Sequence, residues 1–219
     1  MSMRFIGSLS LIWLFLATAA LAQANDPVLD TTGQALQRGQ EYYIKPAVTE
    51  LGGRFTLIDR NSSCPLFVGQ VGSQIGQIGR VGGENVTATE GLPVVFTPFE
   101  EGERVIRVNR DFSVAFSAFT TCAQSTTWKV GERDTETGRR LIVTGAVSEE
   151  SPVWKAGSYF RIEECQSAGG GNIYNLAWCP TEVCPSCRLR CGAIGNLVEN
   201  RKILSALDGN VLPVEFERA

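Results

Sequence analysis

The stretch RVIRVNRDFSVAF, residues 104–116, decides the fold class of this chain. Apolar side chains alternate with polar or small ones on both sides of a short Asn-Arg-Asp interruption. Successive side chains of an extended strand point to opposite faces, so this period is typical of half-buried strands. The stretch therefore predicts one strand over residues 104–108 and a second strand that begins at residue 112 and reaches residue 119.

Similar short runs continue on both sides of this stretch. They cover residues 42–48, 55–58, 66–68, 92–96, 126–130, 141–147, 159–162, 173–178, 194–198, 202–207 and 211–216. Gly, Asn and Asp separate them, and no long segment has the 3.6-residue period of an amphipathic helix. About a dozen short strands are typical of a closed barrel or a sandwich. We therefore expect an all-β fold, with residues 25–219 forming a single domain.

Residues 1–24 have the pattern of a secretory signal peptide. Arg4 supplies a positive charge, residues 5–16 (FIGSLSLIWLFL) are apolar but too short to span a bilayer, and small-x-small cleavage patterns follow at 20–22 and 22–24. No later segment is long enough to cross a membrane, so we expect no membrane partner. The mature protein is expected to be secreted, to an extracellular or vacuolar destination.

Composition excludes several classes of function. The chain has 20 basic and 23 acidic residues, and loss of Arg4 changes its net charge from −3 to −4. A mildly acidic chain with no basic run is unsuited to nucleic acid. The histidine count is zero, which rules out Ser–His and Cys–His catalytic pairs and histidine-bearing zinc sites. We expect no enzyme activity and no cofactor.

Four cysteines lie within CPTEVCPSCRLRC, residues 179–191, with the spacing C-x4-C-x2-C-x3-C. That spacing is close to the pattern of an iron–sulfur or four-thiolate zinc site. In an oxidising compartment such thiols form disulfides instead, so the signal peptide favours disulfides and no metal. The mature chain has seven cysteines, so one is free or pairs with another chain, and spacing alone leaves the pairing open.

Two sequons predict glycan attachment in the secretory pathway. They begin at Asn61 (Asn-Ser-Ser) and at Asn85 (Asn-Val-Thr), both in polar, Gly-rich surroundings that we expect to be exposed.

Several motifs resemble the plant Kunitz (soybean trypsin inhibitor) family. They are VLDTTGQALQRGQEYYI at 28–44, CPL at 64–66, WKV at 128–130 and YFRIEE at 159–164, in the family's order. The tail WCPTEVCPSCRLRCGAIG, residues 178–195, resembles the miraculin-like branch of that family. The resemblance covers essentially the whole mature chain. It implies a β-trefoil of about twelve strands, stapled by disulfides.

The resemblance also implies how the cysteines pair. The implied disulfides are Cys64–Cys122, Cys179–Cys191 and Cys184–Cys187, which leaves Cys165 as the odd thiol. An exposed free thiol is reactive in an oxidising setting, so we expect a disulfide-linked homodimer through Cys165 in part of the population. The clustered cysteines lie far in sequence from the loop described next, so we expect them to serve stability alone.

Inhibitors of this family present one rigid loop to the cleft of a serine protease. The loop that the resemblance implies here consists of Pro98, Phe99, Glu100, Glu101, Gly102, Glu103 and Arg104. The position that is usually basic falls at 100–102 and is not basic. Trypsin has an acidic specificity pocket, so we expect this loop to inhibit trypsin weakly unless Arg104 serves; Phe99 would suit a chymotrypsin-like enzyme.

A second departure concerns the support of the loop. Arg38 stands where the family usually has an Asn that stiffens the loop, which implies a looser loop. The alternative function is a non-inhibitory storage or carbohydrate-binding protein, for which Trp154 or Trp178 would supply an exposed aromatic ring. Trp178, beside Cys179 in an alternating run, is expected in the core. An acid-triggered taste-modifying activity would rest on histidines, which are absent.

Overall fold

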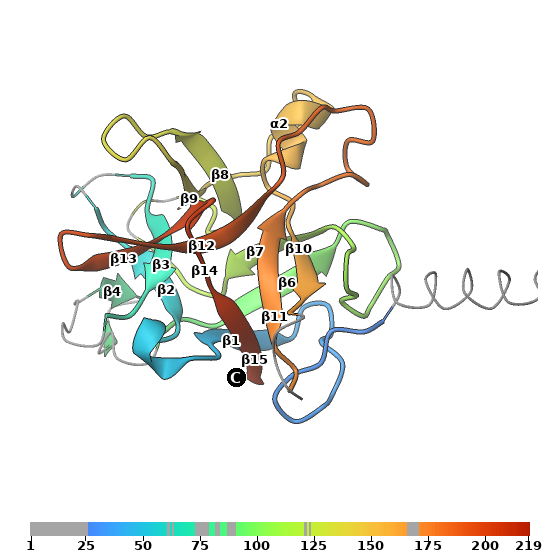
Figure 1. Ribbon diagram of the computed structural model, residues 1–219, viewed down its shortest axis with the longest axis horizontal. Helices are drawn as coiled ribbons and strands as arrows, with labels where there is room; N and C mark the ends of the chain where they lie inside the picture. The colour runs from blue at the N-terminus through green and yellow to red at the C-terminus, as the bar shows by residue number, and fades with distance from the viewer. Residues whose placement is uncertain are drawn as a thin grey trace, which may run out of the picture.

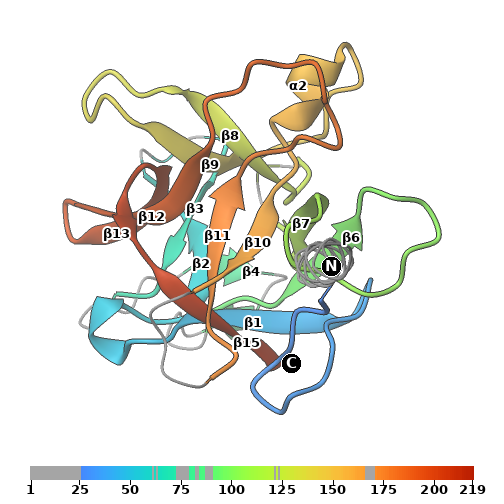
Figure 2. The ribbon, with the colours of Figure 1, turned by 45° about the vertical axis from the view of Figure 1, so that its right-hand side comes forward.

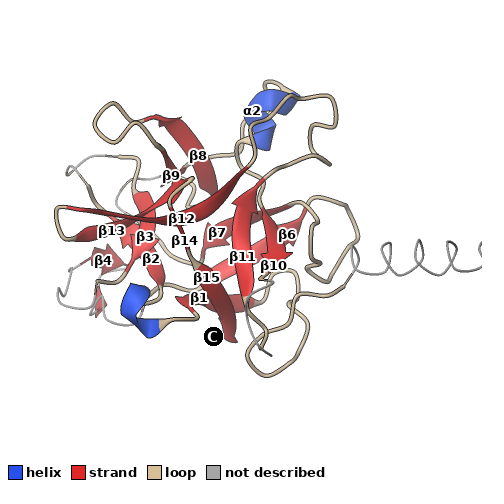
Figure 3. Ribbon diagram, viewed as in Figure 1, coloured by secondary structure: helices blue, strands red, loops and turns tan. Residues whose placement is uncertain are grey.

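The computed structural model describes residues 26–60, 62, 64–72, 79–81, 84–86, 91–120, 122, 124–165 and 171–219. Its strands are β1 (Glu41–Pro46), β2 (Phe55–Ile58), β3 (Phe67–Gln70), β4 (Gly79–Val81), β5 (Glu84–Val86), β6 (Val94–Pro98), β7 (Phe112–Phe116), β8 (Trp128–Arg133), β9 (Arg140–Thr144), β10 (Arg161–Glu164), β11 (Tyr174–Trp178), β12 (Gly192–Glu199), β13 (Lys202–Leu207), β14 (Asn210–Val211) and β15 (Pro213–Arg218). A 3-10 turn, η1 (Thr49–Leu51), and one short helix, α2 (Pro152–Ala156), lie at opposite ends of the strand body (Figure 3).

Thirteen of these strands form one antiparallel sheet, and β4 and β5 pair separately. The sheet runs in the order β2-β3-β9-β13-β12-β11-β15-β1-β6-β7, with β8, β10 and β14 added at its sides (Figure 1). Isolated bridges from Phe112 to Phe160 and from Ala115 to Thr127 join β7 to the residues before β10 and β8. These bridges close the sheet toward a barrel, in which the edge strands are paired and not exposed.

Aromatic side chains fill much of the core. The ring of Phe96 meets Phe112 and Phe216 edge-on, with centroids 5.3 and 5.7 Å apart. Trp128 stacks on Phe55 at 5.5 Å. Such pairs add a little stability beyond the burial of their large apolar surface. The rings come from β2, β6, β7, β8 and β15, so the core unites distant parts of the sequence.

The predicted all-β class is confirmed, and the differences concern one strand boundary, one short helix and the segment 104–108, which is described below. The strand predicted over 112–119 ends at Phe116, and the Phe119 side chain is 85% exposed. Helix α2 was not predicted because it spans a single turn. It begins after Ser151, whose side-chain oxygen accepts a hydrogen bond from the Trp154 N–H, and it has Pro152 at its first position. Among the described residues, no helix is long and apolar enough to cross a membrane.

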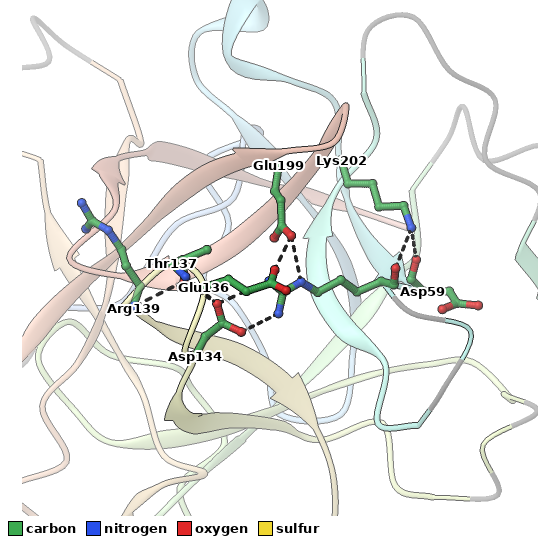
Figure 4. Close-up of polar contacts among 8 residues, drawn as sticks. Asp59, Asp134, Glu136, Thr137, Arg139, Glu199 and Lys202 are labelled. Carbon is green, nitrogen blue, oxygen red and sulfur yellow. Dashed lines mark hydrogen bonds and ion pairs between the residues drawn. The ribbon is translucent and has the colours of Figure 1, made fainter.

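A buried arginine that follows β2 joins the β8–β9 connection to the end of β12. The Arg60 guanidinium is 8% exposed and lies 2.6 Å from Asp134, 3.0 Å from Glu199 and 3.1 Å from Glu136 (Figure 4). These four residues are called the Arg60 cluster below. Hydrogen bonds from Arg60, and then from Thr137, to its charged form hold the pKa of the Asp134 carboxyl well below its usual range.

Candidate reactive loop

The predicted reactive loop, residues 98–104, begins at the end of β6 and occupies the first part of the connection to β7. Pro98 pairs with Phe112 across the two strands, and the Phe99 N–H donates to the Asp111 carbonyl at 2.8 Å. The connection projects from the strand body as the green loop between β6 and β7 (Figure 2). Its two ends are therefore fixed to each other while its apex lies in solvent.

Two of the four exposed residues of the loop are acidic. Glu100, Glu101, Gly102 and Arg104 are exposed, and the Glu100 side chain is 64% exposed. Gly102 has a φ of +87°, a conformation that only glycine adopts without strain. The chain therefore turns at Gly102 and presents carboxylates at the apex of the reactive loop.

Phe99 is held against the scaffold. Its ring meets Tyr159 edge-on, with centroids 5.4 Å apart, and it packs on a small apolar cluster that contains Ala156, Val183 and Cys184. A half-buried ring of this kind is an anchor for the loop, so Phe99 would have to leave the cluster to enter a protease pocket.

The returning half of the connection contains no strand, so the strand predicted over 104–108 is wrong. Val105 and Arg107 instead form isolated bridges with Gln37 and Pro27. The segment 27–37 is itself irregular and pairs with the connection one residue at a time, which explains why the alternating pattern did not produce a ladder.

Arg38 does not brace the reactive loop with its side chain. Its backbone N–H donates to the Arg104 carbonyl at 2.7 Å, and the side chain is exposed. In the part of the chain that the structure describes, the Arg38 guanidinium has neither a hydrogen bond nor an ion pair. The stiffening role that a family Asn would have there must come from other residues.

Arg110 is one of these other residues. Its guanidinium forms ion pairs with Glu100, with Glu103 at 3.9 Å and with Glu182 at 2.5 Å. Partial burial lowers the pKa of Arg110, but the hydrogen bond to Glu100 and the charges of the three carboxylates outweigh burial and raise it. Arg110 thus lies beneath the loop and ties two of its acidic residues to the scaffold.

Asp111 anchors the same connection more deeply. The carboxylate is fully buried and accepts hydrogen bonds from Arg161 Nη2 at 2.6 Å, from the Glu182 N–H at 2.7 Å and from the Val183 N–H at 3.1 Å. The Asp111 N–H in turn donates to the Glu182 carboxylate at 2.9 Å. Buried charges are tolerated when they are paired and fully hydrogen-bonded, as this one is.

Residues 179–191, called the stapled arm below, connect β11 to β12 and supply these partners of Asp111. The Cys179–Cys191 disulfide joins the two ends of the arm, and the Cys184–Cys187 disulfide lies within it. The third disulfide, Cys64–Cys122, lies outside the arm. These are the pairs that the family resemblance implies. The stabilising role expected for the clustered cysteines stays a prediction; the arm that they close also contacts the base of the reactive loop.

The remaining predicted residues lie elsewhere. Cys165 is half-buried and unpaired within the chain. Trp178 is buried, as expected, and donates from Nε1 to the Ala156 carbonyl at 2.9 Å. Residues 1–24 and Asn61 lie outside the described residues, and for Asn85, in β5, the structure describes the backbone alone.

Sequence reasoning missed Arg110, Asp111 and Glu182. The first two stand in the polar interruption of the stretch 104–116, where a turn explained them equally well. Their partner Glu182 is 71 residues away from Asp111, and no local pattern connects the two.

Comparison with known proteins now gives the family. The Kunitz legume family model, described as "Trypsin and protease inhibitor", matches residues 28–218 of this chain. Kunitz type trypsin inhibitor 106 of Medicago truncatula is 44% identical over 220 residues, covering 100% of this chain and 98% of the relative. Miraculin of Synsepalum dulcificum is 30% identical over 215 residues, covering 91% of this chain and 90% of the relative.

A solved structure agrees with these relatives. The Kunitz-type cysteine protease inhibitor PCPI-3 from potato superimposes with a TM-score of 0.71 at 26% identity, over 89% of this chain and 98% of that one. The sheet described above is the β-trefoil that the resemblance implied. The chain belongs to the Kunitz family of trypsin and protease inhibitors.

Proposed function

We propose that this chain is a secreted inhibitor of a serine endopeptidase and that it acts by presenting residues 98–104 to the enzyme's cleft. The observation that carries the proposal is the bracing of the loop from beneath by Arg110 and Asp111. A loop already held in one conformation loses little entropy on binding, so a larger part of its contact energy remains as affinity. The absence of a family Asn at position 38 is offset by these two residues.

The acidic apex of the loop argues against trypsin as the main target. A carboxylate that enters the acidic specificity pocket of trypsin is repelled and loses its hydration, which costs several kcal/mol, on the order of a thousandfold in affinity. Arg104 is the one exposed basic side chain of the loop. We therefore expect a target whose pocket accepts an acidic residue, with weak trypsin inhibition at Arg104.

The experiment is a titration of purified mature protein against trypsin, chymotrypsin, subtilisin and a papain-like cysteine protease, with residual activity as the readout. The proposal expects stoichiometric loss of at least one serine protease activity. A Glu100→Ala/Glu101→Ala variant should change the inhibition constant for that enzyme by tenfold or more. Indifference of all three serine proteases would overturn the proposal, and inhibition of the cysteine protease alone would reassign the target class.

The alternative is a non-inhibitory storage or carbohydrate-binding protein. Trp154 favours it to a degree, because its ring is 54% exposed on α2. Its neighbours Val153 and Lys155 are not the Asn or Asp side chains that usually hydrogen-bond a sugar beside such a ring. Retention on immobilised oligosaccharides, together with failure to inhibit any protease, would support this alternative.

Secretion, glycosylation and dimerisation belong to the same proposal. Residues 1–24 would be removed on export to an extracellular or vacuolar compartment, and Asn61 and Asn85 would carry glycans. The half-buried thiol of Cys165 would link part of the population into homodimers. Mass spectrometry of the exported protein tests the first two points. A non-reducing gel with only monomer, and with Cys165 open to alkylation, would refute the dimer.

A further inference from the structure

The inner half of the stapled arm, around residues 181–184, is turned and partly buried. Its outer half, around residues 188–190, has no turn and is mostly exposed. Val183 and Cys184 are buried, whereas Arg188 and Arg190 are exposed on either side of a half-buried Leu189. The arm runs past α2 as the orange-red loop at the top of Figure 1, and Figure 2 shows it beside the same helix. Alternation of exposed and buried side chains over 188–190 is the pattern of an extended segment.

The backbone of this segment has unused hydrogen-bonding groups. Within the arm, the backbone bonds run from Thr181 to Cys179, from Cys184 to Pro180 and from Cys187 to Cys184. Among the described residues, none forms a backbone hydrogen bond with 188–190. An extended segment with free N–H and C=O groups can be bound as an additional antiparallel strand, which is a general mode of peptide recognition.

The two arginine side chains are also available. In the described part of the chain, neither Arg188 nor Arg190 forms an ion pair or a side-chain hydrogen bond, although the protein as a whole is acidic. A guanidinium forms a bidentate ion pair with a carboxylate such as the one at the bottom of a trypsin-type pocket. A free arginine on a protruding segment meets the steric and electrostatic demands of that pocket.

The segment is held rigidly despite its exposure. Disulfides fix Cys187 and Cys191 on its two sides, and Leu189 packs on the apolar cluster that contains Val183 and Cys184. The buried carboxylate of Asp111 holds the inner half of the arm at two backbone N–H groups. Few degrees of freedom remain to be lost when a partner binds.

Helix α2 adds an apolar surface next to the arm. Its Ala156 shares the apolar cluster with Val183 and Cys184, while the side chains of Val153 and Trp154 are 58% and 54% exposed. Tryptophan and arginine are the residue types that most often carry the binding energy of protein interfaces.

We propose that residues 188–190 form a second protease-binding loop, directed to trypsin-like serine endopeptidases, with Arg188 or Arg190 in the acidic specificity pocket. This loop is separate from the reactive loop at 98–104 and does not depend on the target proposed for it. The chain would then carry an acidic loop and a basic loop with different enzyme preferences.

The test measures trypsin inhibition by the mature, disulfide-bonded protein in an Arg104→Ala background, which removes the basic residue of the other loop. The double variant Arg188→Ala/Arg190→Ala should weaken inhibition by at least a hundredfold, and the single variants identify the residue that enters the pocket. Arg188→Lys/Arg190→Lys should retain inhibition, because lysine also fits an acidic pocket. Arg201→Asn, which removes an exposed charge at a φ of 65° that Asn tolerates, should change it less than twofold.

The proposal is overturned if trypsin is not inhibited in the Arg104→Ala background or if the double alanine variant inhibits equally well. Rapid cleavage after Arg188 or Arg190 with full recovery of trypsin activity would also overturn it, because the segment would then be a substrate. Circular dichroism and thermal unfolding of each variant show whether the fold is kept. Chymotrypsin and subtilisin report on the loop at 98–104, so failure of one proposal is distinguishable from failure of the other.

Discussion

Asp111 and Glu182 hold each other reciprocally across two connections of the barrel. The Asp111 carboxylate accepts the Glu182 backbone N–H at 2.7 Å, and the Asp111 backbone N–H donates to the Glu182 carboxylate at 2.9 Å. The Glu182 carboxylate also forms an ion pair with Arg110. This reciprocal contact joins the stapled arm to the base of the reactive loop, so changes in one should be felt in the other.

Replacement of Asp111 should destabilise the whole fold. Asp111→Ala leaves the Arg161 guanidinium, which is 12% exposed, without its carboxylate and leaves two backbone N–H groups unpaired. Breaking a buried charge pair in this way typically costs about 3–5 kcal/mol. Urea unfolding measures the loss.

The matched control is the surface pair of Lys45 and Glu215, which are 3.4 Å apart and partly exposed. Glu215→Ala should cost less than about 1 kcal/mol, because solvent screens exposed pairs. Similar losses for both variants would mean that Asp111 does not anchor the connection.

Replacement of Arg110 should loosen the reactive loop with a smaller effect on the fold. Arg110→Ala frees Glu100 and leaves Glu103 paired with Arg107 alone, at 3.1 Å. Backbone amides at 99–103 should therefore exchange faster with solvent. We expect about tenfold weaker inhibition of the target protease, equivalent to about 1.4 kcal/mol. Arg133→Ala, in an exposed part of β8, is the control. Unchanged exchange at 99–103 would show that Arg110 does not brace the loop.

The Arg60 cluster should make the stability of the folded protein depend on pH in the acidic range. The pKa of Asp134 in the folded protein is lowered, first by the hydrogen bond from Arg60 and then by those from Thr137. A carboxyl group with a lowered folded-state pKa adds stability above its unfolded pKa, about 3.9, and loses it as the pH falls through the window below that value.

Thermal unfolding between pH 6 and pH 2 tests this dependence. Asp134→Asn should be less stable than the parent protein near neutrality and should lose less stability on acidification. Glu136→Gln is the control, since Glu136 contacts the same arginine but is 76% exposed. Parallel pH profiles for the parent and Asp134→Asn would contradict the prediction.

The Cys64–Cys122 disulfide should matter more for stability, and the Cys184–Cys187 disulfide should matter more for protease inhibition. Chain entropy predicts that loss of Cys64–Cys122, with a sequence separation of 58, costs about 4 kcal/mol, against about 2 kcal/mol for Cys184–Cys187, with a separation of 3. Removal of the shorter bridge should nevertheless weaken protease inhibition more, because Phe99 packs on the cluster that contains Cys184. Paired Cys→Ala variants, assayed for unfolding and inhibition, test the contrast.

The strands were predictable because their signal is local. In β1, β6 and β7 every second side chain is buried, and in β7 the same alternation is visible in the sequence. Residues 104–108 have that pattern too, but their neighbour is the irregular segment 27–37, and a strand needs a partner strand. The location of the reactive loop came from family resemblance, and the exposure of its acidic apex agrees with its polar sequence.

The support of the loop was not predictable, because it depends on contacts between distant residues. Asp111 and Glu182 lie 71 positions apart in the sequence and are neighbours only in the folded barrel. Phe99 is half-buried because Tyr159 and the arm cover it, and its own neighbours in sequence gave no indication of this. The polar residues before β7 resembled an ordinary turn until their partners were known.

The most direct measurement is the position of the bond that an inhibited serine protease cuts slowly. Mature protein is incubated with subtilisin or chymotrypsin until inhibition is complete, and the products are mapped by mass spectrometry under reducing conditions. We expect saturable inhibition and one slow cut within residues 98–105. Rapid degradation at many sites, or saturable inhibition with no cut in 98–105, would contradict this expectation.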